Sequence, residues 1–171
     1  MNNNLENIKL LLENSANGVT ITLGDSSRML DSKTIKSVVE HFEQWLDWHA
    51  HWIHEANCYK DYSIEKIDSE LHEEAERSKM YDDYPIEYSV GFDFASYLGI
   101  STELGFCNNT EASEIVKADW KKQFPYWEKD LEFDPESNFC YVYTKRRNVA
   151  RAFRWWSYNK YIKHHLEDFK V

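Results

Sequence analysis

The stretch that decides the fold is IEYSVGFDF, residues 86–94. Every second residue in it is large and apolar, and in an extended chain these five side chains share one face: Ile86, Tyr88, Val90, Phe92 and Phe94. We therefore predict a β-strand with one buried face. Two more segments, GVTITLG at 18–24 and FCYVY at 139–143, show patterns typical of strands.

Most of the remaining chain has helical periodicity. Helices are predicted at residues 5–17, 32–58, 63–80, 110–124 and 148–169. Because helices and strands are mixed along the chain, we expect an α+β fold. This would be a single domain over residues 1–171, with a small, mostly antiparallel sheet packed against several helices.

Composition limits the class of protein. The chain has 171 residues, of which 42% are hydrophobic and 16% aromatic, enough to bury the core of one domain. We expect no signal peptide and no membrane span, because no apolar run approaches the roughly 18 residues that a span requires. The three cysteines are far apart, which predicts reduced thiols in a cytoplasmic protein: Cys58, Cys107 and Cys140.

Charge is distributed unevenly along the chain. Residues 1–144 hold 28 acidic and 12 basic side chains, whereas residues 145–171 hold 2 acidic and 8 basic ones. The net charge is −10. A field of this sign disfavours direct binding of nucleic acid and favours a basic protein as partner.

The segment HFEQWLDWHAHWIHEANCY, residues 41–59, is rich in histidine and tryptophan. On a helix its histidines point in different directions, and His49 falls within the apolar face: Ile35, Val38, Val39, Phe42, Leu46, His49 and Ile53. A structural zinc site needs about four converging ligands. We therefore interpret His49 as a core imidazole and expect neither metal nor cofactor.

A second ridge lies beside this apolar face and consists of Trp45, Trp48 and Trp52. Three interpretations are open. The helix is buried on two sides, or the ridge is partly exposed and anchors a protein partner, a role in which tryptophan is common. The third is stacking of nucleobases, which the surrounding acidic residues disfavour.

Two acidic regions complete the candidate partner-binding site. Residues 61–93 contain eleven acidic and three basic side chains, and EKDLEFDPE, residues 128–136, has an acid at every second position. If the second segment were extended, its five carboxylates would line one side at about 6.5 Å spacing, with Leu131 and Phe133 facing inward. Solvated surface is the alternative for both regions. The acidic candidates are Glu70, Glu73, Glu74, Asp82, Asp83, Glu128, Asp130, Glu132 and Asp134.

The predicted last helix begins with a cluster of cations, Lys145, Arg146, Arg147, Arg151 and Arg154. Cations at a helix N-terminus oppose the macrodipole, so an acidic group should compensate them. We favour the protein's own carboxylates, with an external anion as the alternative.

The sequence lacks GxSxG, P-loop, GxGxxG, HExxH and kinase motifs, and we expect no enzymatic activity. The function it favours is an acidic inhibitor, such as an immunity protein or antitoxin that neutralises a basic toxin, for example a nuclease. Two alternatives stay open. One is a phage-type inhibitor that mimics nucleic acid, and the other is a small hydrolase or metal-dependent enzyme that uses His49, His72 and nearby carboxylates.

Overall fold

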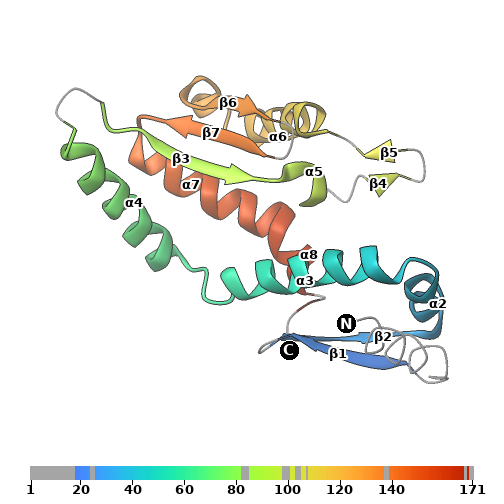
Figure 1. The fold of residues 1–171 in the computed structure, drawn as a ribbon. Coiled ribbons are helices and arrows are strands. Elements are labelled where there is room, and N and C mark those ends of the chain that lie inside the picture. Colours follow the sequence, from blue (N-terminus) through green and yellow to red (C-terminus); the bar gives the residue numbers. More distant parts are fainter. Residues whose placement is uncertain are drawn as a thin grey trace. The chain divides into compact units, whose positions relative to one another are not determined.

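The computed structural model describes residues 18–23, 26–81, 85–97, 101–102, 105–106, 108–136, 139–167 and 169. The helix predicted at 5–17 lies outside them. By its internal contacts the chain divides into two compact units (Figure 1), which are described separately. Unit 1 comprises Met1–Asp61 with Leu166–Val171, and unit 2 comprises Tyr62–His165. That the whole chain acts as one domain stays a prediction.

Unit 1 contains a β-hairpin followed by two helices. Strand β1 (Val19–Leu23) was predicted, and it pairs antiparallel with β2 (Ser26–Leu30), which was not. Helices α2 (Ser32–Glu40) and α3 (Phe42–Cys58) follow. The hairpin and helices share a core of buried Leu30, Ile35, Val38 and Phe42, with Val19, Val39 and Leu46 packed against it.

The single helix predicted over residues 32–58 is interrupted at His41. Its backbone leaves helical geometry (φ −132°, ψ 43°), although its N–H still bonds to the Ser37 carbonyl. The predicted apolar face survives the break, since Ile53 and His49 are buried as well as the α2 residues. Periodicity therefore located the buried face correctly, but it did not reveal the change of direction.

Unit 2 is built around a three-stranded antiparallel sheet. Strands β3 (Tyr88–Phe92), β7 (Cys140–Thr144) and β6 (Glu132–Pro135) pair in the order β3-β7-β6. A small second ladder joins β4 (Ser101–Thr102) to β5 (Gly105–Phe106). The α+β class and the antiparallel sheet are thus confirmed. Strand β3 is shorter than predicted, because Phe94 begins helix α5 (Phe94–Tyr97).

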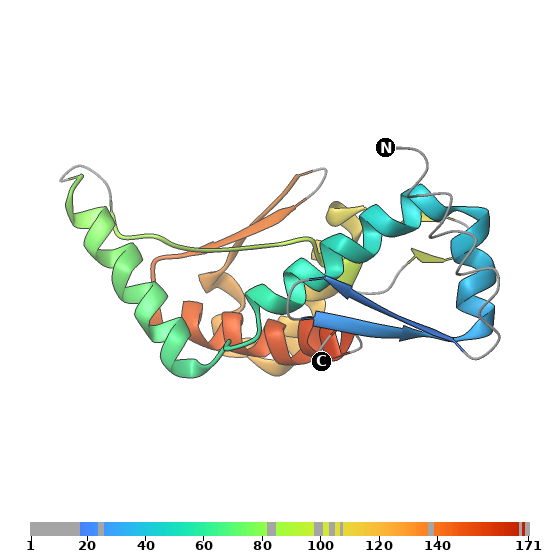
Figure 2. The same cartoon turned by 60° about the horizontal axis from the view of Figure 1, so that its bottom comes forward.

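Helices pack against one face of this sheet (Figure 2). They are α4 (Ile64–Lys79), α6 (Asn109–Gln123) and α7 (Arg147–Ser157). Ile67 and Leu71 of α4 form a core with Tyr88 of β3 and Ala150 of α7. Trp120 of α6 packs edge-on against Phe153 of α7, with ring centroids 5.3 Å apart. These contacts fix the sheet on a helical layer.

Two segments differ in geometry from the predicted regular elements. Residues Pro125–Asp130 form a 3-10 helix, η1, where an extended chain had been considered. The helix predicted at 148–169 begins as α7, widens into a π-helical segment, η2 (Tyr158–Ile162), and ends as α8 (Lys163–Glu167). Tyr158, Tyr161 and Ile162 of the widened segment are buried. Burial of these three side chains stabilises the irregular backbone.

Asp119 joins α6 to the widened segment and gives unit 2 a pH-dependent contact. Its carboxylate accepts hydrogen bonds from Lys160 at 2.6 Å and from the Tyr161 hydroxyl at 2.7 Å. These hydrogen bonds, that of Lys160 first, lower the pKa of Asp119. A lowered pKa in the folded state adds stability above the carboxyl's ordinary pKa, and this stability is lost as pH falls through the folded-state value.

We predict that Asp119→Asn lowers the free energy of unfolding by about 1 kcal/mol at neutral pH, because charge-assisted hydrogen bonds are replaced by weaker ones. The deficit should shrink as pH falls below about 4, where the carboxylate of the unfolded chain becomes protonated, and it should disappear once pH falls through the lowered folded-state pKa. Denaturant unfolding of both proteins at neutral and acidic pH measures it. A deficit independent of pH would contradict the ionic contribution.

Candidate functional site

Two of the cations at the start of α7 pair with carboxylates of unit 2, and a third donates to a backbone carbonyl. Arg146 pairs with Asp130 of η1 at 2.7 Å, and Arg151 lies 3.5 Å from the Asp68 carboxylate of α4. The Arg147 guanidinium donates to the Asp68 carbonyl at 3.2 Å. The preference for internal pairing is therefore confirmed. These contacts supply the compensation that a helix start rich in cations requires.

Arg154, one turn further along α7, is buried rather than exposed. Only 4% of the residue is accessible, and its guanidinium bonds to the Glu74 carboxylate and the Ser89 carbonyl. Glu70 approaches it at 3.5 Å. One side chain thus ties α7 to both α4 and β3. A buried guanidinium is tolerated only when such partners replace its hydration.

Several of the predicted partner-binding acids are paired with cations of the same unit. Glu70 and Glu74 pair with Arg154, Asp130 pairs with Arg146, and Glu128 pairs with Lys121 at 2.7 Å. The row of five carboxylates expected over 128–136 does not form, because Glu128 and Asp130 lie on a 3-10 helix instead of an extended strand. Four of the nine acidic candidates therefore have a partner within unit 2.

Other acidic side chains pair with no cation among the described residues. Glu132, Asp134 and Glu136 are exposed on β6 and just after it, and Glu87 is exposed before β3. Within the part of the chain that the structure describes, none of these carboxylates forms an ion pair. Glu73, exposed on α4, shares this property. The candidates Asp82 and Asp83 lie outside the described residues.

A row of aromatic rings runs beside these carboxylates on the sheet face opposite the helices. Phe139, Tyr141 and Tyr143 follow one another at alternate positions, with ring centroids 6.3 and 6.2 Å apart and planes inclined by 24° and 20°. Phe139 is 45% exposed, and the two tyrosines are half-buried. We call these three residues the aromatic row.

Strand register places one acidic residue opposite each ring. Glu132 faces Tyr143 and Asp134 faces Tyr141 across the β6–β7 pair. The Glu136 N–H donates to the Phe139 carbonyl at 2.6 Å, which continues the same pairing by one step. Residues directly opposite in an antiparallel pair share a face of the sheet. The surface is therefore an edge of carboxylates along a row of rings.

The neighbours of the aromatic row support this description. Partial burial, followed by the negative charge of Asp134, raises the pKa of Tyr143, and Tyr141, Glu136 and Glu87 contribute further. On the other side, the Tyr141 ring lies against Gly91 of β3, where a Cβ would come within 3.1 Å of its Cε1 atom. The missing side chain at Gly91 leaves room for this ring.

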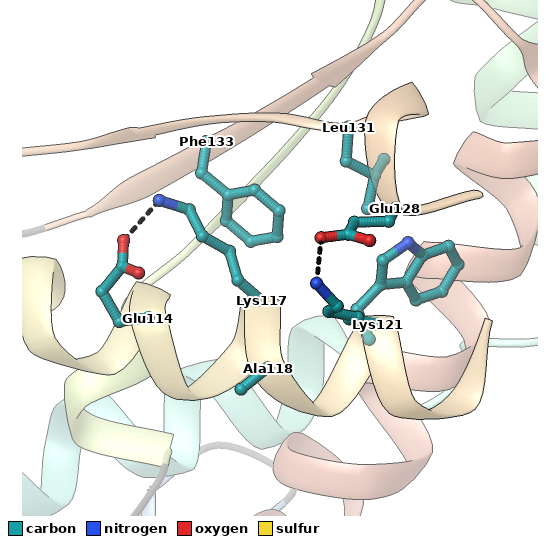
Figure 3. A pocket seen from close by; sticks show the side chains of 8 residues that line it. Glu114, Lys117, Ala118, Lys121, Glu128, Leu131 and Phe133 are labelled. Carbon is teal, nitrogen blue, oxygen red and sulfur yellow. Dashed lines mark hydrogen bonds and ion pairs between the residues drawn. The ribbon is translucent and has the colours of Figure 1, made fainter. Parts of the chain in front are cut away.

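A separate hollow of about 490 Å³ lies between α6, η1 and β6. Figure 3 shows Lys117 and Lys121 rising from α6, each joined to a glutamate. Trp120, Leu131 and Phe133 provide its apolar lining. The lysines are neutralised by Glu114 at 2.5 Å and Glu128 at 2.7 Å, so this hollow gains no net attraction for a charged partner.

Of the predicted tryptophan ridge on α3, the structure describes the side chain of Trp52. Trp52 is 2% exposed and stacks on Phe169 within unit 1, which matches a helix buried on two sides. We therefore withdraw it as a partner anchor. The side chains of Trp45 and Trp48 lie outside what the structure describes.

Among the residues that the structure describes, the histidines and cysteines show no arrangement typical of an active site. His49 is buried in unit 1, 5.6 Å from the Phe169 ring, whereas His72 is exposed on α4 of unit 2. Exposed Cys58 lies 3.6 Å from His54 at the end of α3. Among the described residues, no group of three or more His, Cys, Asp or Glu side chains is placed to hold a metal ion.

Sequence reasoning missed the two most informative features of unit 2. It treated Arg154 as one member of the cationic cluster at the start of the last helix, although burial gives it a separate role. It predicted the strand at 139–143 without noticing that the aromatic residues at 139, 141 and 143 alternate with the buried Cys140 and Val142. That alternation was the available signal, because alternate residues of a strand face opposite sides.

Comparison with protein-family models, with curated proteins and with solved structures finds no match to this chain. In the described part of the chain, no helix combines the length and the apolar character that crossing a membrane demands. The function must therefore be argued from the geometry of the site itself.

We predict that Arg154→Met lowers the free energy of unfolding by about 3 to 5 kcal/mol, because it leaves the mostly buried Glu74 carboxylate without its cation. Adding Glu74→Leu should recover part of this loss. Arg151→Met provides the control, since its pair is exposed and worth about 1 kcal/mol or less. Denaturant unfolding measures all three. Equal losses of unfolding free energy in Arg154→Met and Arg151→Met would show that the buried ion pair of Arg154 contributes no more stability than an exposed one.

A second prediction concerns the start of α7. Arg146→Glu should destabilise the protein because it places a second negative charge beside Asp130, and the loss should be larger at low salt. Lys145→Glu is the matched control, since exposed Lys145 has no ion pair with another described residue. Thermal unfolding at low and high salt compares them. If Arg146→Glu raised stability, an external anion would be the better explanation of the cluster.

Proposed function

We propose that this protein is an acidic inhibitor that binds a basic protein and neutralises it, in the manner of an immunity protein or antitoxin directed against a toxin such as a nuclease. The cytoplasm is the compartment we propose, in keeping with the free thiol of Cys140. The contact surface in this proposal combines the aromatic row with the exposed acids of β6 and of the residue just after it, Glu132, Asp134 and Glu136. We call these three acids the β6 edge.

The observation that carries the proposal is that the acids of this surface form no ion pair with any described residue. The cations at the start of α7 bind acids of α4 and η1, yet Glu87, Glu132, Asp134 and Glu136 stay without an ion pair in the described structure. Repulsion among neighbouring carboxylates costs stability, and a basic partner would relieve it.

The aromatic row supplies what charge alone would lack. Exposed carboxylates steer a basic partner and raise the association rate, but each exposed pair adds little affinity. Tyrosine and other aromatic side chains act as anchors in protein interfaces because they bury a large area with little loss of conformational entropy. On this sheet face the acids would therefore speed association with the partner, and the rings would slow its dissociation.

Affinity capture from the source organism, followed by binding kinetics with the captured basic protein, tests this function. We expect Glu132→Lys/Asp134→Lys to slow association about tenfold at low salt, with a smaller effect at high salt. Tyr141→Ala should instead speed dissociation, because it removes an aromatic side chain that the bound partner would cover.

The matched control is Glu40→Lys/Asp47→Lys, which makes the same change in net charge on exposed residues of unit 1. It should leave the association rate much closer to that of the wild type. Equal slowing by both double variants would show that only overall charge matters and would remove the β6 edge from the proposal. Turnover of a small molecule by the pure protein, with no protein captured, would contradict the function itself.

A further inference from the structure

We propose that the aromatic row and the β6 edge bind an extended, basic segment of the partner that carries arginine at every second position. This inference rests on the proposed function and deepens it, since it names the chemistry of the contact. The occupant is a strand-like Arg-x-Arg-x-Arg segment whose guanidinium groups lie on the rings and pair with the carboxylates opposite them.

Spacing is the first argument. The three ring centroids are separated by 6.3 and 6.2 Å along the strand. An extended chain advances about 3.2 to 3.4 Å per residue, so side chains at alternate positions recur at about 6.4 to 6.8 Å. An extended segment can therefore place successive alternate side chains over successive rings. A helical segment, which advances about 1.5 Å per residue, has no such match at two-residue intervals.

The pairing of each ring with an acid is the second argument. Tyr141 has Asp134 opposite it, and Tyr143 has Glu132, so each position offers an aromatic ring and a carboxylate within reach of one side chain. A guanidinium is planar, stacks on aromatic rings and forms two parallel hydrogen bonds to a carboxylate. The surface thus combines the two groups that arginine recognises best.

Lysine satisfies these requirements less well. Its ammonium is a compact, strongly hydrated charge that neither stacks as a plane nor binds a carboxylate through a fork of donors. A purely electrostatic surface would bind both cations about equally. Preference for arginine over lysine is therefore the property that separates the aromatic row from a simple acidic patch.

Three synthetic peptides of equal charge test the inference on the full chain: Arg-Ser-Arg-Ser-Arg-Ser, its lysine counterpart, and Arg-Arg-Arg-Ser-Ser-Ser. Isothermal titration calorimetry at low salt measures the affinities. We expect the alternating arginine peptide to bind about five- to tenfold more tightly than the lysine peptide, on the scale of a few cation–π contacts. It should also exceed the contiguous arginine peptide by about threefold, on the scale of a single such contact.

Substitution of the rings provides the second measurement. Tyr143→Leu preserves a half-buried apolar side chain, and we expect it to reduce the preference for arginine while weak binding of the lysine peptide persists. Ile115→Ala, which alters an exposed apolar residue on α6, is the control and should leave the preference unchanged. Thermal unfolding confirms that both variants remain folded.

Equal affinity of the arginine and lysine peptides would overturn the inference, as would failure of the alternating peptide to bind. If both peptides bound equally and both were lost in Glu132→Lys/Asp134→Lys, the charge-based function would stand without arginine recognition. A preference for arginine that survived Tyr143→Leu and Tyr141→Ala would likewise remove the aromatic row from the contact. The proposed function fails separately, if no basic protein is captured.

Discussion

The buried guanidinium of Arg154 is the constraint around which unit 2 is organised. It reaches from α7 to the Glu74 carboxylate of α4 and to the Ser89 carbonyl of β3, so that two helices and a strand meet at one charge. Such a charge is stable only while all its partners remain in place. The position of α4 against α7, and of both helices under the sheet, therefore depends on an ionic contact as well as on the apolar core of Ile67, Leu71, Tyr88 and Ala150.

This constraint also explains how the acidic residues divide into two groups. Carboxylates that lie near α7 act on the protein itself, as Asp68, Glu74 and Asp130 do. The carboxylates of the β6 edge form no ion pair with a described residue, although Glu132 lines a hollow together with Lys145 and Arg146. Along β6, Glu132 and Asp134 alternate with the half-buried Phe133. The first group stabilises the fold, and the second is available to a partner. Net charge alone does not distinguish the two.

The open sheet face shows how local spacing produces a surface with a specific chemistry. Alternation along β7 sends Cys140 and Val142 into the core and leaves Tyr141 and Tyr143 on the other face. Antiparallel pairing then sets an acidic residue of β6 opposite each tyrosine, and Gly91 of β3 gives the Tyr141 ring space. Strands β6 and β7, which are neighbours in sequence, thus contribute the charge and the rings, and the distant strand β3 contributes the room for them.

The sequence by itself determined the elements whose pattern is local. Alternation in 86–94 and 139–143 identified β3 and β7, and helical periodicity identified α4, α6 and the buried face that includes His49. The compensation of the α7 cations was also foreseeable, because a helix dipole requires it wherever the partners lie. The tertiary structure alone decided which acids remain unpaired, that Arg154 is buried, that Trp52 belongs to a core and that η1 replaces an extended chain. Each of these depends on contacts between residues far apart in sequence, and a local pattern of charge or hydrophobicity carries no information about distant neighbours.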